Sequence, residues 1–307
     1  MAMHLPPVSR RRFLAGSLAA GAGLVLNGTA FADEAGADPN SWALLADTHI
    51  FAQRDEVVRG VKMAENFARV SDELLTMKTL PAGVIVNGDC AYLEGQAADY
   101  QVLAELVAPV SRGGLPVHMT LGNHDHRDRF WEALESAAEE RPPEERPLES
   151  RHVAVLQTPR ANWFLLDSLQ STNVTPGSLG EEQLAWLAKA LDAHADKPAL
   201  IVAHHHPDPG GEHPISGLTD TGALFDLLKP RRQVKAYIYG HTHHWQVGQQ
   251  DGIHLINLPP VAYLFNAADP NGWVHCRLQE NGATLEVRAL NAEHPAHGKQ
   301  VQLKWRA

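Results

Sequence analysis

Cysteine is scarce in this sequence of 307 residues, which contains only Cys90 and Cys276. At most one disulfide is therefore possible, and only if the fold brings the two residues within bonding distance; we expect two buried free thiols. Basic residues are also few, with 26 Lys and Arg against 36 Asp and Glu. Non-specific binding of nucleic acid needs a basic surface, so we expect no nucleic-acid partner.

Long apolar runs are absent beyond the first 32 residues, so we expect no membrane span in the mature chain. Near the N-terminus, Ser9-Arg10-Arg11-Arg12-Phe13-Leu14 forms a twin-arginine pattern, followed by an apolar run over 14–26 and a small-x-small cleavage site at 30–32. A membrane anchor is the alternative, but a span needs about 20 apolar residues. We predict that residues 1–32 are a signal peptide, which implies a periplasmic or secreted protein.

Residues 33–307 are then predicted to form one domain, and this length is sufficient for a large core. The predicted leader carries three arginines and no acid, so its removal changes the formal charge from −10 to −10 − 3 = −13. The chain contains neither an internal repeat nor a low-complexity tract.

Apolar runs alternate with helical patterns from residue 42 onwards, which predicts an α/β architecture. We expect helices over 56–77, 97–107, 130–140 and 179–193, and strands over 42–46, 84–86, 116–121, 200–203 and 234–239. Two further strands, 152–156 and 163–166, are assigned to a second sheet. Residues 245–248, 253–257, 273–278 and 284–290 are predicted as antiparallel strands, with hairpin turns at Asp251-Gly252 and Asn281-Gly282.

Five of the predicted strands end in polar residues that can bind a metal. The side chains concerned are Asp47 and His49, Asp89, Asn123 with the neighbouring His124, the run His204-His205-His206, and His241 with His243. Each group alone has an ordinary interpretation as a turn or a helix cap. In open α/β sheets, however, sites form beyond the carboxyl ends of the strands. All five groups can therefore converge on one pocket.

In this order the groups resemble the five sequence blocks of the calcineurin-like metallophosphoesterases. The matching blocks are Asp47-x-His49, Gly88-Asp89, Gly122-Asn123-His124-Asp125, His205-x-Pro207 and Gly240-His241-x-His243. The resemblance covers about residues 42–263. It implies two mixed β-sheets in a four-layer α/β/β/α sandwich with a two-metal site at one edge.

The resemblance also implies a role for each residue. Asp47, His49 and His243 would bind one metal, and Asn123, His205 and His241 the other. Asp89 would bridge both metals. His124 would act without binding metal, as the catalytic residue next to the reacting phosphorus. Within the triple histidine, His205 is favoured because the family ligand usually lies two residues before the proline, and His204 is the alternative.

The donor set agrees with this scheme on chemical grounds. Carboxylate, imidazole and amide ligands suit Mn, Fe or Zn, and no thiolate is needed. Two such metals about 3.5–4 Å apart acidify a bridging water, and the resulting hydroxide attacks a phosphoryl group. We therefore expect a two-metal phosphoesterase acting on a small phosphoester. Asp125-x-Arg127 resembles the cyclic-nucleotide and glycerophosphodiester branch, which favours phosphodiesters.

Three alternatives remain. One is an acid-phosphatase-like phosphomonoesterase, and another is a non-catalytic metal-binding protein of the same fold. A zinc peptidase is disfavoured because the sequence has no His-Glu-x-x-His helix. Residues that could line a substrate pocket are His126, Arg127, Arg129, Trp131 and the loop 258–265. Cys90 is assigned a structural role.

Overall fold

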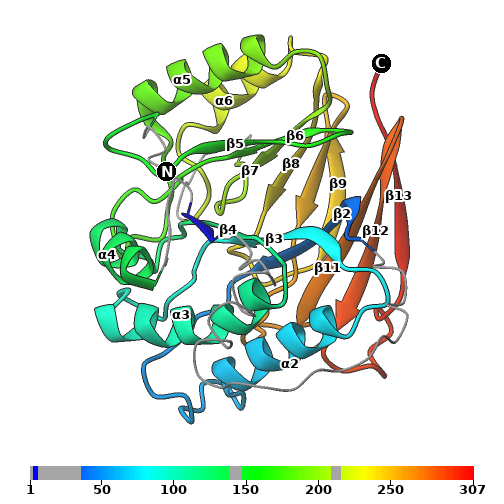
Figure 1. Cartoon of the computed structure of the whole chain (residues 1–307). Coiled ribbons are helices and arrows are strands. Elements are labelled where there is room, and N and C mark those ends of the chain that lie inside the picture. The colour runs from blue at the N-terminus through cyan, green and yellow to red at the C-terminus, as the bar shows by residue number, and fades with distance from the viewer. Residues whose placement is uncertain (1–2, 6–35, 138–146, 209–215) are drawn as a thin grey trace, which may run out of the picture.

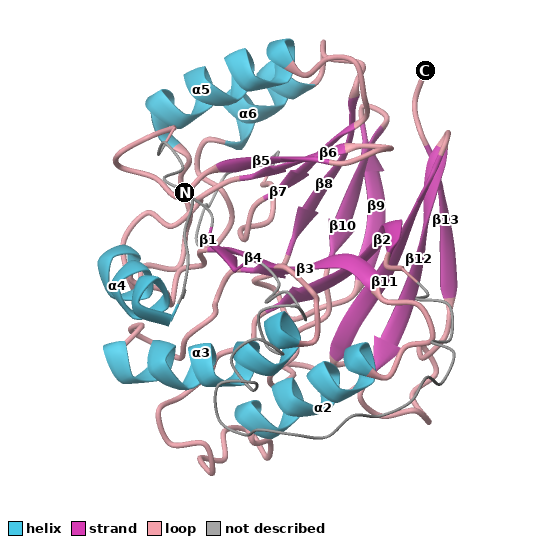
Figure 2. Cartoon of the chain, viewed as in Figure 1, coloured by secondary structure: helices cyan, strands magenta, loops and turns pink. Residues whose placement is uncertain are grey.

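The strands form two sheets in the computed structural model, which describes residues 3–5, 36–137, 147–208 and 216–307. The first sheet has the order β1-β4-β3-β2-β11-β12-β13 and the second β5-β6-β7-β8-β10-β9. Helices cover the outer face of each sheet, which gives the expected α/β/β/α sandwich (Figures 1 and 2). The fold class predicted from the sequence is confirmed.

Strands of the first sheet are β1 (Met3–Leu5), β2 (Asp38–Ala46), β3 (Pro81–Asn87), β4 (Val117–Thr120), β11 (Gly272–Gln279), β12 (Gly282–Ala289) and β13 (Gln300–Lys304). The second sheet contains β5 (Ala154–Gln157), β6 (Asn162–Leu165), β7 (Ala199–Val202), β8 (Val234–Tyr239), β9 (Gln246–Gln250) and β10 (Ile253–Asn257). The helices are α2 (Met63–Leu75), α3 (Ala97–Arg112), α4 (Arg127–Ala137), α5 (Gly180–Ala193) and α6 (Thr221–Leu228).

The layers follow from the alternation of side chains along each strand. In β2, Ala43 and Leu45 pack in the cluster under α2 and α3, whereas Leu44 faces the space between the sheets. In β7, Leu200 and Val202 face that same space, whereas Ile201 packs toward α5 and α6. The strands therefore bury both of their faces, as strands in a sandwich of this kind must.

Helix α2 begins at Met63 and not near residue 56 as predicted. The segment before it turns sharply at Arg59 (φ 47°) and Gly60 (φ 84°), both in the left-handed region, which a right-handed helix cannot contain. The valines on either side of this turn fit a helical period, and for this reason the helix was predicted to begin too early in the chain. The short elements β1, α6 and β13 were not predicted from the sequence.

The C-terminal strands differ in two respects from the prediction. Strand β10 is antiparallel to β9, as expected, but its other neighbour, β8, runs parallel to it. Asp251 and Gly252 form the predicted left-handed turn, with φ of 51° and 79°. In the second hairpin Gly282 already pairs with Gln279, so the turn lies at Glu280-Asn281. A Cβ atom at position 282 would lie 2.0 Å from the Leu303 carbonyl, so glycine is required there by the approach of β13.

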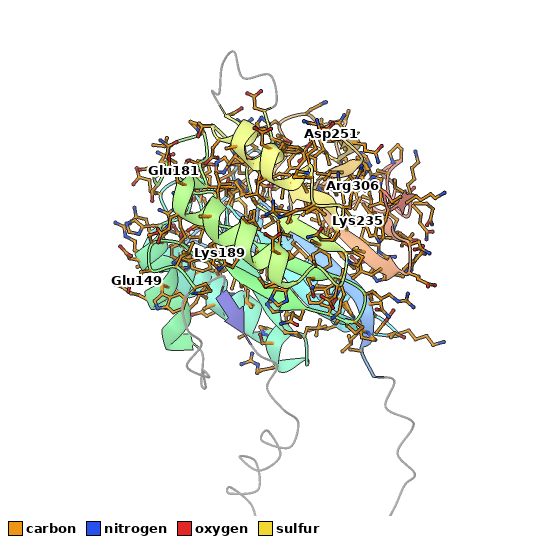
Figure 3. The ribbon with its side chains drawn as sticks, turned by 90° about the horizontal axis from the view of Figure 1, so that it is seen from above. Glu149, Glu181, Lys189, Lys235, Asp251 and Arg306 are labelled. Atoms are coloured by element: carbon orange, nitrogen blue, oxygen red, sulfur yellow. The ribbon has the colours of Figure 1, made fainter. Side chains whose placement is uncertain are left out.

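Arg306 ties the C-terminal segment to the second sheet and its helices. Its guanidinium donates to the backbone carbonyls of Leu228, the last residue of α6, and of Arg231 just beyond it, and to those of Val234 and Asp251. These carbonyls include acceptors that the end of a helix leaves unpaired. Figure 3 shows Arg306 close to Asp251 and Lys235, and the Lys235 ammonium donates to the Arg306 carbonyl at 2.6 Å.

Both cysteines are buried and free, as predicted, and they lie in different hydrophobic clusters. Within the described residues, no helix has the length and apolarity needed to cross a membrane. Most of the predicted leader lies outside the described residues. Only residues 3–5 of it are described, as strand β1 along the edge of β4.

Candidate dinuclear metal centre

The predicted site residues follow the carboxyl ends of strands from both sheets. Strands β2, β3 and β4 are parallel neighbours in the first sheet, and β7 and β8 are parallel neighbours in the second. Asn87, the last residue of β3, connects the strand ends of the first sheet to those of the second. Its amide donates to the carbonyls of Ala203 (3.0 Å) and Ile238 (3.3 Å), and its Oδ1 accepts from Thr120 at 2.8 Å. The two sheets are thus bonded together beside the site.

Backbone strain is concentrated at the same residues. Asp47, His49, Asp89, His241 and His243 all have φ between 45° and 69°. Residues other than glycine rarely adopt this region, and such outliers persist where surrounding structure enforces them. These left-handed residues lie one to four positions beyond the ends of β2, β3 and β8, and ligand atoms of their side chains come together in two groups.

Glycines make room for this convergence. A Cβ atom on Gly122 would lie 2.2 Å from Oδ1 of Asp89, and one on Gly240 would lie 2.5 Å from Oδ2 of Asp47. Both contacts are shorter than van der Waals distance. Gly122 and Gly240 are therefore required because a carboxylate of another block packs against each of them.

The first group of potential ligands consists of Asp47, His49 and His243, all buried. The Nε2 atoms of His49 and His243 are 3.1 Å apart, and Nε2 of His243 lies 3.5 Å from Oδ1 of Asp47. Burial lowers the pKa of His49 to about 3, against the raising effect of the Asp89 carboxylate. The imidazole is therefore neutral, which is the form that binds metals.

The second group consists of Asp89, His204 and His241. Oδ2 of Asp89 lies 3.2 Å from Nε2 of His204 and 3.7 Å from Nε2 of His49. One carboxylate therefore reaches ligand atoms of both groups. Burial alone would lower the pKa of His204, but Asp89 and Asp47 outweigh it and raise the value to about 9.

Three of the histidines are oriented by backbone carbonyls. The Nδ1 atoms of His204, His243 and His124 contact the carbonyls of Asn87 (2.9 Å), Tyr263 (2.7 Å) and Leu93 (2.7 Å). A carbonyl only accepts hydrogen bonds, so each Nδ1 must carry the hydrogen. Nε2 is left free to face the site, and outer hydrogen bonds of this kind are typical of histidines that bind metals.

Within the triple histidine, the structure places His204 rather than His205 in the second group. Nδ1 of His205 contacts the Ser168 hydroxyl at 2.8 Å, and its Nε2 contacts the Thr175 carbonyl at 3.1 Å. Both nitrogens of His205 are therefore occupied outside the two groups. Nε2 of His204, in contrast, has no hydrogen-bond partner although it is buried and faces Asp89. His204, the alternative residue, takes the place predicted for His205.

The set of donors fits a pair of metal ions. The Oδ1 atom of Asn123 is buried without a hydrogen-bond partner, as is Nε2 of His204. Buried polar atoms are normally paired, and an ion is one explanation of an exception. Two carboxylates, four imidazoles and one amide oxygen gather here, and no thiolate is among them. Such a set suits Mn, Fe or Zn.

His124 lies at the edge of the groups and does not belong to either of them. Its backbone N–H donates to Oδ1 of Asp89 at 2.9 Å, and its ring packs edge-on against that of His49. His124 is partly exposed, whereas all three residues of the first group are buried. This position agrees with the predicted role of a residue that exchanges a proton with a bound molecule.

Asp125 has a structural role. Its carboxylate accepts hydrogen bonds from the N–H groups of Cys90, Ala91 and Gly122 and from the Tyr100 hydroxyl, at 2.9 to 3.1 Å. It therefore joins the chain after Asp89 to the chain before Asn123. Burial, followed by repulsion from Asp89, raises the pKa of Asp125 to about 6.

The residues suggested for the substrate pocket divide into two sets. Arg127 makes a bidentate ion pair with Asp167, so its guanidinium has a structural use. Arg129 contacts backbone carbonyls of the loop that contains Glu94, and Trp131 packs against His152. None of these three contacts involves the ligand groups.

The loop 258–265, in contrast, lies directly at the site. The N–H groups of Val261 and Ala262 donate to carbonyls at the end of β2, and this brings two aromatic rings to the ligands. Tyr263 stacks on His49 and Phe265 stacks on His243. Sequence reasoning missed one further neighbour, Arg59, whose guanidinium lies over both rings. The dipeptide Arg59-Gly60 between two valines was the available signal for a turn.

Comparison with known proteins agrees with this geometry. The chain is 29% identical over 226 residues to a 3′,5′-cyclic adenosine monophosphate phosphodiesterase, CpdA, from Pseudomonas aeruginosa, covering 72% of this chain and 76% of that protein. It is also 29% identical over 260 residues to CpdA from Escherichia coli K12, covering 80% and 88%.

Solved structures show the same fold. A dimetal phosphatase from Danio rerio superimposes with a TM-score of 0.67 at 16% identity, covering 88% of this chain and 100% of that one. A purple acid phosphatase from yellow lupin gives a TM-score of 0.56 at 14% identity, covering 86% and 53%. The sequence profile of the calcineurin-like phosphoesterases matches residues 43–245, about two thirds of the chain. This chain therefore belongs to the calcineurin-like phosphoesterase family and is a metal-dependent hydrolase of phosphoric esters.

Proposed function

We propose that this protein hydrolyses phosphodiesters at a centre that binds two ions of Mn, Fe or Zn. The observation that carries the proposal is the position of Asp89. Its Oδ2 atom lies within 3.7 Å of a histidine nitrogen in each ligand group, so one carboxylate can serve both ions. When bound, such a pair polarises a phosphoryl oxygen and lowers the pKa of water.

The proposed ligands follow the predicted scheme with one substitution. Asp47, His49 and His243 hold one ion, and Asn123, His204 and His241 hold the other. The left-handed backbone at these strand ends supports the assignment, because it fixes the side chains before any ion binds. His205 is assigned a positioning role behind His204 and His241, whose rings it contacts at centroid distances of 5.1 and 4.7 Å.

His124 is the proposed proton-handling residue. The Leu93 carbonyl holds the hydrogen on Nδ1, so the only free position of the ring is Nε2. When protonated there, His124 can donate to the oxygen of the departing alcohol; when neutral, it can accept a proton. Its backbone N–H, bonded to Asp89, keeps the ring beside the proposed bridging carboxylate.

The preference for diesters rests on the relatives, which are named as cyclic adenosine monophosphate phosphodiesterases. Turnover of bis(p-nitrophenyl) phosphate and p-nitrophenyl phosphate by metal-reconstituted protein tests it. We expect the diester to be hydrolysed faster. A much faster reaction with the monoester would show an acid-phosphatase-like enzyme instead, and no turnover of either would favour the non-catalytic alternative.

Two variants test the roles of the residues. We expect His124→Ala to retain both ions but to lose about 10²- to 10⁴-fold in kcat, the usual contribution of a proton donor or acceptor. Asp89→Asn should lose at least one ion and nearly all activity. Metal content and kcat are measured on the same preparations. A His124→Ala protein with fewer ions than wild type, or with wild-type kcat, would remove His124 from its proposed role.

We also propose that the protein is exported by the twin-arginine route to the periplasm or beyond. The support is the pattern Ser9-Arg10-Arg11-Arg12-Phe13-Leu14 and the apolar run that follows it. Cell fractionation of wild type and of an Arg10→Lys/Arg11→Lys variant tests this proposal. Wild type should be found outside the cytoplasm and shortened, and the variant should remain inside. Equal distribution of the two proteins would refute it.

A further inference from the structure

A tight hairpin projects one cation over the aromatic rings at the metal centre. Val58 and Val61 exchange two backbone hydrogen bonds, at 2.9 and 3.0 Å, across the two-residue turn Arg59-Gly60. Both turn residues have positive φ, which is the geometry of a type I′ hairpin turn. The side chain of Arg59 is therefore carried by a short closed loop with a defined direction.

The guanidinium of Arg59 rests on two rings. It lies 5.1 Å from the centre of the Phe265 ring and 5.6 Å from that of Tyr263. Within the part of the chain that the structure describes, it has no carboxylate partner and no hydrogen bond. No described residue thus occupies any of its five N–H donors, and its flat surface is of the kind that stacks on aromatic groups.

Phe265 is the other half of this arrangement. Its ring stacks on that of the proposed ligand His243 at a centroid distance of 4.2 Å and an angle of 20°. Although it lies next to a buried histidine, 56% of Phe265 is exposed. An exposed phenyl ring that stacks on a proposed metal ligand is costly to leave in water. This cost suggests that a bound ligand covers the ring.

The surrounding rim is apolar as well. The large hydrophobic residues that are exposed in the described part of the chain are Val57, Leu93, Val174 and Phe265. Each is close to the centre: the Leu93 carbonyl contacts His124, and Val174 follows Asn173, whose N–H donates to the Asn123 carbonyl. Val57 precedes the Arg59 hairpin. The backbone at Leu93 and next to Val174 thus lies near the centre, and the Phe265 side chain contacts His243 itself.

We propose that Arg59 and Phe265 form a clamp that binds the planar base of a nucleotide substrate. This inference rests on the proposed phosphodiesterase function and specifies the group attached to the phosphorus. A base presents a π surface to the phenyl ring and the guanidinium, and ring nitrogens and carbonyls to the free N–H donors. A glycerol or choline ester offers no such surface. Arg59 and Phe265 are therefore specificity determinants for nucleotides.

The test compares two substrates that differ only in the base: 3′,5′-cyclic AMP and the 3′,5′-cyclic phosphate of methyl riboside. Stacking of one base typically changes binding by roughly 5- to 150-fold. We expect kcat/KM of wild type to favour cyclic AMP by a factor in this range, and Arg59→Ala and Phe265→Ala each to reduce that ratio at least about fivefold. Phe265→Tyr, which keeps an aromatic ring at this position, should keep the wild-type ratio. Arg160→Ala, a change of an exposed arginine on the β5–β6 turn, is the matched control and should leave the ratio unchanged.

The ratio of kcat/KM for the two substrates distinguishes a loss of base recognition from damage to the metal centre. A variant that merely disturbs His243 loses activity on both substrates equally, and an unchanged ratio in Arg59→Ala and Phe265→Ala overturns the clamp. If wild type hydrolyses neither substrate, the proposed function fails. The clamp is then tested by calorimetric binding of AMP and ribose 5-phosphate to metal-loaded protein. Tighter binding of AMP that is lost in Arg59→Ala supports the clamp, and equal binding of the two probes refutes it.

Discussion

Removal of the Asp125 carboxylate is the most informative test of how the fold supports the centre. In Asp125→Ala, the N–H groups of Cys90, Ala91 and Gly122 and the hydroxyl of Tyr100 lose their acceptor. A buried donor without a partner costs about 1–3 kcal/mol, so four such donors give about 4–12 kcal/mol. Water can enter the space that the carboxylate leaves.

Removal of the buried charge offsets a further part of this cost. The raised pKa of Asp125 shows that its charged form is disfavoured where it lies. We therefore expect the lower limit, a loss of about 4 kcal/mol in the free energy of unfolding. Urea denaturation of metal-free protein, followed by circular dichroism, measures it as a shift in midpoint at constant slope.

The matched control is Asp128→Ala, which removes an exposed carboxylate from the first turn of α4. It should cost less than about 1 kcal/mol, the usual value of an acidic residue near a helix N-terminus. If Asp125→Ala is destabilised no more than Asp128→Ala, the four hydrogen bonds do not hold the two loops together, and the structural role assigned to Asp125 is refuted.

Three further predictions concern the glycines, the C-terminus and the metals. Gly122→Ala forces a Cβ atom to 2.2 Å from Oδ1 of Asp89, so metal affinity measured by chelator competition should fall at least about tenfold; unchanged affinity would contradict the close packing. Arg306→Ala should lower the unfolding free energy by about 2–3 kcal/mol, because it removes charged hydrogen bonds to carbonyls, whereas Arg232→Ala should change it by less than about 0.5 kcal/mol. Removing metal with a chelator should abolish activity and lower the Tm, and adding Mn or Zn should restore both.

The fold was largely predictable because most residues of the parallel strands that lead to the site are apolar and polar residues follow where these strands end. Strand β8 was predicted with its observed bounds, and β7 to within a residue at each end. Short elements could not be found in this way. Helix α6 has eight residues, too few to establish a period, and β13 alternates only briefly near the C-terminus. The start of α2 was misplaced because valines around Arg59-Gly60 fit a helical pattern.

The sequence alone could not decide which of His204 and His205 lies in the ligand group. Both residues lie in a bend beyond β7, where the alternation of side chains along a strand no longer holds, and their ring centroids are only 5.1 Å apart, so the sequence does not indicate the direction of either side chain. Which direction leads to the metal centre depends on partners far away in the sequence. The Asn87 carbonyl orients His204, whereas Ser168 and the Thr175 carbonyl hold His205. Spacing from the proline carries none of this information.

The metal content of two neighbouring variants tests the central claim most directly. Wild type, His204→Ala and His205→Ala are reconstituted with Mn, separated from free metal and analysed by mass spectrometry. The two ligand groups predict two ions per chain in wild type and in His205→Ala, and about one in His204→Ala. Two ions bound to His204→Ala together with a loss of metal from His205→Ala would contradict the proposed centre.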